Sequence, residues 1–291
     1  MEERTFRVEK ENSGKRVDTY LKEKIPEYSR SFIQYLISEG NLKINEKIIF
    51  EKDYHVKEND SITIKIVPPP YKEIKKEKID VPIIYEDSSI VAVDKPPFMV
   101  VHPACGNYSG TLLQALSYKY PGIYLVHRLD KETSGLIIAC KNKKAQVFLQ
   151  KQFKERTVKK VYLAIVKGKM FNETGRIEAP LQRNPLDRKK FDVVPYKENS
   201  RMAITEYKVL DYIGNYTLLE VYPKTGRTHQ IRVHLSHIGF PVAGDPIYGK
   251  REFFPRTMLH SYKLEFIHPE TKEKISLSTD IPEDFKEFIE K

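Results

Sequence analysis

Cysteine is scarce in this 291-residue chain, which has only Cys105 and Cys140. Two cysteines cannot build the disulfide framework of a small secreted domain, so we expect a reducing, cytoplasmic environment. No Cys/His group has the spacing of zinc ligands, and we predict no metal site. The sequence also lacks an apolar run of membrane-spanning length, and residues 1–12 are too charged for a secretory signal. We therefore expect no membrane partner.

Acidic residues are outnumbered, with 40 Asp/Glu against 50 Lys/Arg and a formal net charge of +10. Such a charge favours a polyanionic partner, most often nucleic acid. Residues 1–67 carry 13 basic and 13 acidic residues, so the excess falls on the rest of the chain. Residues 141–160 alone have eight basic residues and one acidic residue. A Lys-rich and Glu-rich chain can also be basic without binding nucleic acid, so charge alone leaves both readings open.

A proline-rich and charged segment, VPPPYKEIKKEKIDVP, covers residues 67–82. Consecutive prolines fix an extended backbone, and a charged run after them is typical of a linker. We predict a small domain at residues 1–67, a linker at 68–80 and a large domain at 81–291.

The small domain has the pattern of two helices followed by short strands. Apolar residues at intervals of four predict a helix over residues 15–24, and Ser29 and Gly40 are expected to cap and stop a second helix. This α/β order resembles the S4 RNA-binding domain. The matching residues are Arg16, Asp18, Ser29-Arg30, Gln34, Gly40 and Leu42-Lys43-Ile44-Asn45. The resemblance implies RNA contacts by Arg16, Arg30 and Lys43, although a protein-binding adaptor domain is the alternative.

The large domain mixes strands and helices without a regular βαβ rhythm. Segments such as KKVYLAIVKG and YTLLEVYP predict strands, and KKAQVFLQKQFKE predicts an amphipathic helix. Several strands are joined through hairpins rather than through helices. The sequence therefore predicts an α+β domain with a mixed, largely antiparallel sheet and helices.

Asp130 lies in the polar loop VHRLDKETSGL, directly before a buried strand. Loops held by rigid neighbours often carry catalytic side chains. An Asp in a polar turn is more often a local hydrogen-bonding device, so the loop alone is a weak signal.

A second polar segment, KTGRTHQIRVHLSHIG, places Arg227 at the predicted start of a helix capped by Thr228. Free amides and the helix dipole favour anions at such a site, and a guanidinium can hold a carboxylate bidentately. The alternative is that Arg227 only holds its loop. The three histidines of the segment do not share one helical face, so they do not predict a metal site.

Tyr162 alternates with apolar residues in the predicted strand KKVYLAIVKG. The plain interpretation is a half-buried strand tyrosine. The functional interpretation is an aromatic platform or a proton-handling group beside Asp130.

Five segments in this order resemble the Rlu family of pseudouridine synthases. They are VAVDKPPFMVVHPA, VHRLDKETSGL, KKVYLAIVKG, KTGRTHQIRVHLSHIGFPVAGDPIYG and MLHSYKLEF. The resemblance covers about residues 80–290 and implies the pseudouridine synthase fold and isomerisation of uridine in RNA without a cofactor. Phe98 departs from the family, which usually has a small residue there, and is expected to reshape the floor of the pocket.

The resemblance also implies roles for individual residues. Asp130 matches the essential aspartate, Tyr162 the active-site tyrosine, and Arg227 the arginine that pairs with the aspartate. Arg128 matches the residue that enters the RNA in place of the flipped base. The remaining expectations are RNA contacts by His127 and Lys95 and apolar pocket walls from Ile231 and Leu235. Asp130 would either attack C1′ or remove the C2′ proton, and the sequence does not choose between these routes.

An S4-like domain joined to this domain is similar to members that act on large-subunit ribosomal RNA. We therefore expect a monomer that modifies uridines in 23S ribosomal RNA or in the pre-ribosomal large subunit. The alternative is an RNA-binding ribosome-assembly factor on the same fold without catalysis.

Overall fold

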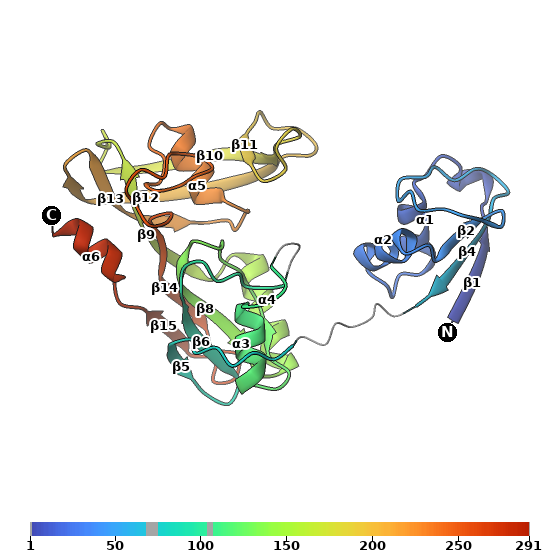
Figure 1. Ribbon diagram of the computed structural model, residues 1–291, viewed down its shortest axis with the longest axis horizontal. Helices are drawn as coiled ribbons and strands as arrows, with labels where there is room; N and C mark the ends of the chain where they lie inside the picture. The colour runs from blue at the N-terminus through green and yellow to red at the C-terminus, as the bar shows by residue number, and fades with distance from the viewer. Residues whose placement is uncertain (1, 68–74, 104–106, 291) are drawn as a thin grey trace. The chain divides into compact units, whose positions relative to one another are not determined.

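The computed structural model describes residues 2–67, 75–103 and 107–290 (Figure 1). The chain divides into two compact units, Met1–Glu73 and Ile74–Lys291. Residues 68–74 of the predicted linker lie outside the described residues. Further along, Glu77 of the predicted linker belongs to the second unit, where its backbone N–H donates to the carbonyl of Gln114 at 3.2 Å. Among the helices in the described residues, none is both long enough and apolar enough to cross a membrane.

The first unit is a small antiparallel sheet packed with two helices. Its elements are β1 (Glu2–Arg7), the 3₁₀ helix η1 (Lys10–Asn12), α1 (Val17–Lys24), α2 (Arg30–Ser38), β2 (Leu42–Ile44), β3 (Lys47–Ile48) and β4 (Ser61–Ile66). The strand order is β1-β4-β2-β3. As predicted, the Ser29 hydroxyl caps α2 by accepting from the Phe32 N–H at 3.2 Å, and Gly40 ends it with φ +74°.

The second unit contains a large mixed sheet. Its strands are β5 (Ile83–Glu86), β6 (Ile90–Lys95), β7 (Tyr124–Leu125), β8 (Ser134–Cys140), β9 (Lys159–Lys167), β10 (Thr174–Arg183), β11 (Phe191–Val193), β12 (Arg201–Ile213), β13 (Tyr216–Pro223), β14 (Leu259–Ile267) and β15 (Lys274–Ser278). Its helices are α3 (Leu112–Lys119), α4 (Lys143–Glu155), α5 (Gln230–His237) and α6 (Glu283–Ile289). Among the strands described, only β14 and β8 pair in parallel. This confirms the predicted α+β class and the largely antiparallel sheet.

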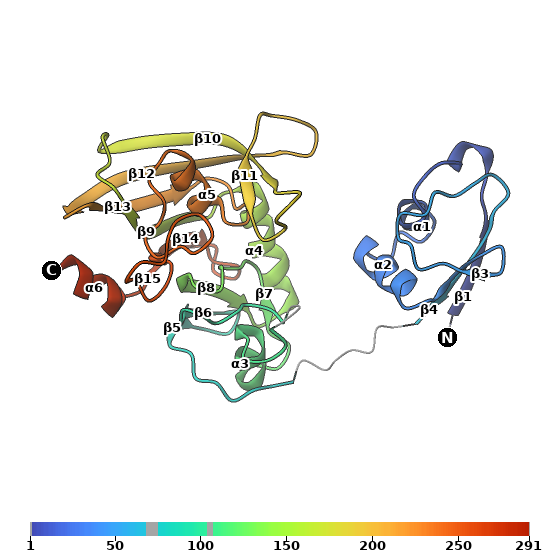
Figure 2. The same ribbon diagram turned by 45° about the horizontal axis from the view of Figure 1, so that its top comes forward.

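Two strands place the functional segments. β8 is buried along its whole length and lies in the main strand order β11-β10-β12-β13-β9-β14-β8-β6-β5. The loop that enters β8 carries Asp130, and β9, two strands away in this order, carries Tyr162. The helix α4 packs against β7 and β8 (Figure 2).

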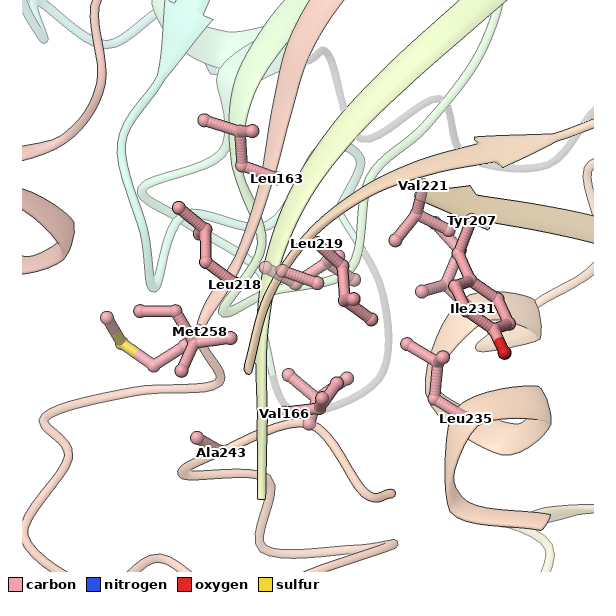
Figure 3. Packing of buried hydrophobic residues seen from close by; sticks show 14 of the residues in the cluster. Leu163, Val166, Tyr207, Leu218, Leu219, Val221, Ile231, Leu235, Ala243 and Met258 are labelled. Atoms are coloured by element: carbon pink, nitrogen blue, oxygen red, sulfur yellow. The ribbon is translucent and has the colours of Figure 1, made fainter. Parts of the chain in front are cut away.

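The helix α5 covers the other half of the sheet. It contacts β10, β11, β12 and β13 (Figure 1), and its apolar side chains pack in the buried clusters of these strands. Ile231 and Leu235, one turn apart on α5, point toward Tyr207 and Val221 of the strands (Figure 3). These residues belong to the core cluster that fixes α5 on the sheet, so the loop before α5 is held in one place.

Candidate active site

The loop between β7 and β8 is held by hydrogen bonds at His127 and Glu132 and at Ser134, the first residue of β8. His127 Nε2 accepts from the Ile138 N–H at 2.9 Å, and the Ser134 hydroxyl lies 2.8 Å from His260 Nδ1. The Glu132 carboxylate accepts from Arg251 at 2.6 Å and from the Thr257 N–H at 2.9 Å. These bonds fix the backbone on both sides of Asp130, which is the condition for a pre-organised side chain.

Lys95 lies at the end of β6 and is fully buried. Its ammonium donates to the carbonyls of Pro96 at 2.7 Å, Met99 at 2.9 Å and Lys131 at 3.3 Å. Burial lowers its pKa to about 7, assisted by the charge of Arg256 and opposed by Asp130 and Asp94. The predicted RNA contact of Lys95 is therefore wrong, because its three donors tie the loop beside Asp130 to the end of β6.

Asp130 forms an ion pair with Arg232 of α5. Arg232 Nη1 donates to Asp130 Oδ2 at 3.0 Å. Nε and Nη2 of the same guanidinium donate to Asp245 at 2.7 and 2.8 Å. Asp245 is fully buried and also accepts from the Ile247 N–H at 2.9 Å. Arg232 is thus held bidentately by one carboxylate and presents its remaining edge to the other.

The protonation state of Arg232 follows from the same network. Burial on its own would lower the pKa of the guanidinium, but the hydrogen bonds and charges of Asp245 and Asp130 raise it above its ordinary value. The guanidinium also lies over the Tyr248 ring, 5.2 Å from its centroid. A permanent positive charge therefore stands beside Asp130.

The predicted pairing of Arg227 with Asp130 is contradicted. The helix α5 begins at Gln230, not after Thr228, and its N-cap is His229 in the left-handed region at φ +56° without a side-chain cap. Arg227 therefore lies in a loop, where its Nε donates to the Met202 carbonyl at 3.4 Å. The helix starts one residue later than predicted, and the arginine that reaches Asp130 is Arg232, inside the helix.

Tyr162 lies half-buried on β9 beside the Asp130 loop. Its backbone pairs with Val221 of β13 and Ser261 of β14. Burial raises the pKa of its phenol to about 12, with a lowering contribution from a Ser261 hydrogen bond and a raising one from the Asp130 charge. Tyr162 therefore keeps its proton near neutral pH.

A cavity of about 490 Å³ joins these segments. Asp130, Tyr162, Arg227, Arg232 and Ile231 line it. Arg128 and His127 line it as well, so their predicted RNA contacts stay predictions.

Two expected pocket residues lie elsewhere. Leu235 is fully buried in the core that joins α5 to the sheet (Figure 3), so it is not a pocket wall. Phe98 is half exposed and does not line the cavity, so it does not shape the cavity floor. Its φ of +66° explains why a small residue suits this position, because a side chain is strained in the left-handed region.

The arginines predicted to bind RNA in the first unit converge on one carboxylate. Arg16 and Arg30 both donate to Asp18, at distances from 2.9 to 3.2 Å, and Gln34 donates to it at 2.6 Å. Lys43 lies 3.6 Å from Glu46 in a separate exposed pair. Because Arg16 and Arg30 stay substantially exposed, they remain candidates for RNA contact.

Sequence reasoning missed Arg232 and Asp245. A signal was present, since Arg232 stands between Ile231 and Val233 in the apolar part of α5. A charged residue at such a position is rarely buried without a partner. In the described part of the chain, no group of three or more His, Cys, Asp and Glu is arranged to hold a metal ion.

The family model for RNA pseudouridylate synthase matches residues 89–237, which contain Asp130, Tyr162 and Arg232. The chain belongs to this family. The S4 domain model matches residues 15–62, so the first unit contains an S4 domain.

Relatives match along nearly the whole chain. An uncharacterised RNA pseudouridine synthase of Aquifex aeolicus is 40% identical, over 97% of this chain and 94% of its own. Ribosomal large subunit pseudouridine synthase D of Pseudomonas aeruginosa is 37% identical, over 98% of this chain and 94% of its own. The solved structure of human RNA pseudouridylate synthase domain containing 1 superposes with a TM-score of 0.62 at 29% identity, over 72% of this chain and 85% of that one.

Proposed function

We propose that this chain isomerises specific uridines to pseudouridine in 23S ribosomal RNA, with Asp130 as the catalytic residue. The observation that carries the proposal is the Asp130 carboxylate, held by Arg232 at 3.0 Å in a cavity shared with Tyr162. Relatives named ribosomal large subunit pseudouridine synthase D support the choice of ribosomal RNA.

The chemistry follows from the charge that develops. Breaking the bond between C1′ and N1 builds positive charge at C1′, which a fixed carboxylate stabilises. Arg232 keeps one oxygen of Asp130 occupied and directs the other toward the sugar. Asp130 then either bonds to C1′ or takes the C2′ proton, and both routes use the same oxygen.

Tyr162 supports the uracil ring while it turns. Its raised pKa makes it a poor base near neutral pH, so stacking is the role that we assign to it. Ile231 offers apolar surface in the same cavity. Arg128, exposed in the loop before Asp130, fills the gap that the flipped base leaves in the RNA.

The S4 domain holds the substrate through Arg16, Arg30 and Lys43, and Arg227 contributes to RNA binding rather than to the Asp130 pair. We propose that the protein works as a monomer in the cytoplasm and needs no cofactor. The alternative, an assembly factor that binds RNA without catalysis, is not favoured by an intact Asp130–Arg232 pair.

Tritium release from RNA labelled at uridine C5 tests the proposal. We expect release with the wild-type protein on in vitro transcribed 23S ribosomal RNA and none with Asp130→Asn, which keeps the shape but lacks the charge. Mapping of pseudouridine in the product then locates the target. If the wild-type protein leaves every uridine unchanged while still binding the RNA, the assembly-factor alternative replaces the enzyme.

A further inference from the structure

The cavity beside Asp130 carries more positive charge than its acidic residue neutralises. Among the described residues that line it, Asp130 alone is acidic. The basic residues are Arg128, Lys154, Arg156, Lys160, Arg227 and Arg232. Arg232 is neutralised by Asp130 and Asp245. For the other five, the described part of the chain offers no carboxylate within 4.0 Å, which leaves an uncompensated positive surface.

Three of these groups line the cavity together: Lys160 and Arg227 are partly buried, and Arg156 is exposed. Lys160 stands two residues before Tyr162 on β9 and shares its face of the sheet. Its ammonium donates to the Thr225 carbonyl at 3.1 Å and lies 3.8 Å from where a Cβ of Gly226 would be. The lysine is therefore held beneath the turn that carries Arg227.

Arg156 completes the group from the end of α4. It is the C-cap residue, in the left-handed region at φ +63°, four residues before Lys160. We name Arg156, Lys160 and Arg227 the cationic wall. Its members come from the end of α4, from β9 and from the loop before α5, so the fold brings Arg227 to a pair of charges that lies far from it in the sequence.

The members of the cationic wall repel one another. Burial, together with the Arg156 charge, lowers the pKa of Lys160 to about 8. Burial also lowers the pKa of Arg227, with added repulsion from Arg201 and Arg156. Like charges held together in a half-buried cavity are unfavourable on their own, and an anion bound among them removes that cost.

We propose that the cationic wall binds a backbone phosphate of the RNA, next to the nucleotide whose base enters the cavity. The inference rests on the proposed function and assigns a partner to a part of the site that does not touch the uracil. A flipped nucleotide brings its flanking phosphates to the rim of the cavity, since each nucleotide of RNA carries one. A guanidinium and an ammonium together match the several oxygens of a phosphodiester.

Single-turnover kinetics on in vitro transcribed 23S ribosomal RNA test the proposal. Lys160→Gln and Arg227→Gln are each expected to raise the RNA concentration for half-maximal rate by roughly tenfold at low salt, as loss of a charge-assisted bond does. The maximal rate should stay within about threefold of wild type, since chemistry remains with Asp130. The slope of log affinity against log salt should fall by about 0.7 per lost contact.

Matched variants complete the test. Lys151→Gln removes a charge from the same helix as Arg156, but from an exposed position paired with Glu155, and should leave affinity and salt slope unchanged. Lys160→Arg keeps the charge and should retain most of the affinity. A neutral methylphosphonate at the linkage flanking the mapped uridine should weaken binding to wild type but not weaken Arg227→Gln further.

The outcomes separate the two proposals. If wild type forms pseudouridine and the cationic-wall variants keep its affinity and salt slope, the phosphate site is overturned while the enzyme stands. If the variants lose maximal rate with unchanged affinity, the wall acts on chemistry and the phosphate assignment fails. If wild type forms no pseudouridine at all, the proposed function fails first.

Discussion

Asp18 in the S4 domain and Asp130 in the catalytic unit are both carboxylates held by arginine, in opposite proportions. Asp18 is shared by two arginines, Arg16 and Arg30, and accepts from Gln34 as well. Asp130 has one arginine, and it shares that arginine with Asp245. In the first site the carboxylate is saturated with donors, and in the second the arginine is saturated with acceptors.

The number of arginines bound to each carboxylate decides whether the carboxylate has an oxygen left for a substrate. The side chain of Asp18 is fully buried, and both of its oxygens accept hydrogen bonds. The side chain of Asp130 keeps 21% of its surface exposed, and Oδ2 is its atom bonded to Arg232. A saturated carboxylate orients its arginines and stabilises the fold. A partly occupied carboxylate, fixed from one side, keeps an oxygen for a substrate.

The largest effect is expected when the arginine of the second site is removed. Arg232→Gln leaves Asp245 buried without its counter-charge and frees Asp130 to turn. We expect a loss of maximal rate of at least roughly 100-fold, since a fixed charge next to the reacting group is worth several kcal/mol. Tritium release under single-turnover conditions measures it.

Arg227→Gln gives the contrast for that measurement. This variant should raise the RNA concentration needed for half-maximal rate and leave the maximal rate nearly unchanged. A large loss of maximal rate with Arg227→Gln and a small one with Arg232→Gln would reverse the comparison and restore the pairing expected from the sequence.

A smaller effect is expected when Asp245, the other carboxylate bound by Arg232, is neutralised. Asp245→Asn keeps the shape of the side chain but weakens its hold on Nε and Nη2 of Arg232. Asp245 acts through Arg232, so it is a positioning residue. We expect the maximal rate to fall roughly tenfold, about the effect of one weakened charge-assisted bond, with RNA affinity near that of wild type. An unchanged rate would show that Asp130 alone suffices to orient Arg232.

The arrangement of elements was predictable from the sequence, and the decisive pair was not. Alternation in KKVYLAIVKG and the apolar run in SGLIIAC depend on local patterns, which is why β9 and β8 were expected where they lie. The start of α5 depends on the Gln230 side chain, whose oxygen accepts from the Arg227 N–H at 3.0 Å and from the Thr225 hydroxyl at 2.6 Å. These two hydrogen bonds hold Thr225 and Arg227 in a turn before the helix, so the helix starts after Thr228.

The prediction that Lys95 contacts RNA was wrong for a different reason. Lysine is mostly exposed in proteins, so an RNA contact was the natural expectation. Its actual role depends on three carbonyls, one of them from Lys131, thirty-six residues away in the chain. Contacts at such separations are set by the packed fold and leave no local pattern to read.

The smallest effect is expected in the first site, as a dependence of stability on acid. Burial opposes ionisation of Asp18, but hydrogen bonds from Arg16, Gln34 and Arg30 outweigh it and lower its pKa from 3.8 to about 2. A lowered pKa stabilises the folded S4 domain above the unfolded value, and that contribution is lost as pH falls through the folded value.

Between about pH 4 and pH 2, the S4 domain should therefore lose roughly 2 kcal/mol of stability through Asp18. Hydrogen exchange of amides in α1 and α2 of the full chain, followed against pH, measures this loss. Asp18→Asn is the matched control, because it cannot ionise and should remove this part of the acid dependence while being less stable at neutral pH. The same acid profile in wild type and Asp18→Asn would mean that the two arginines do not stabilise the charged carboxylate. Asp18 would then not stabilise the S4 domain through its charge, and the proposed structural role of a fully hydrogen-bonded aspartate would be wrong.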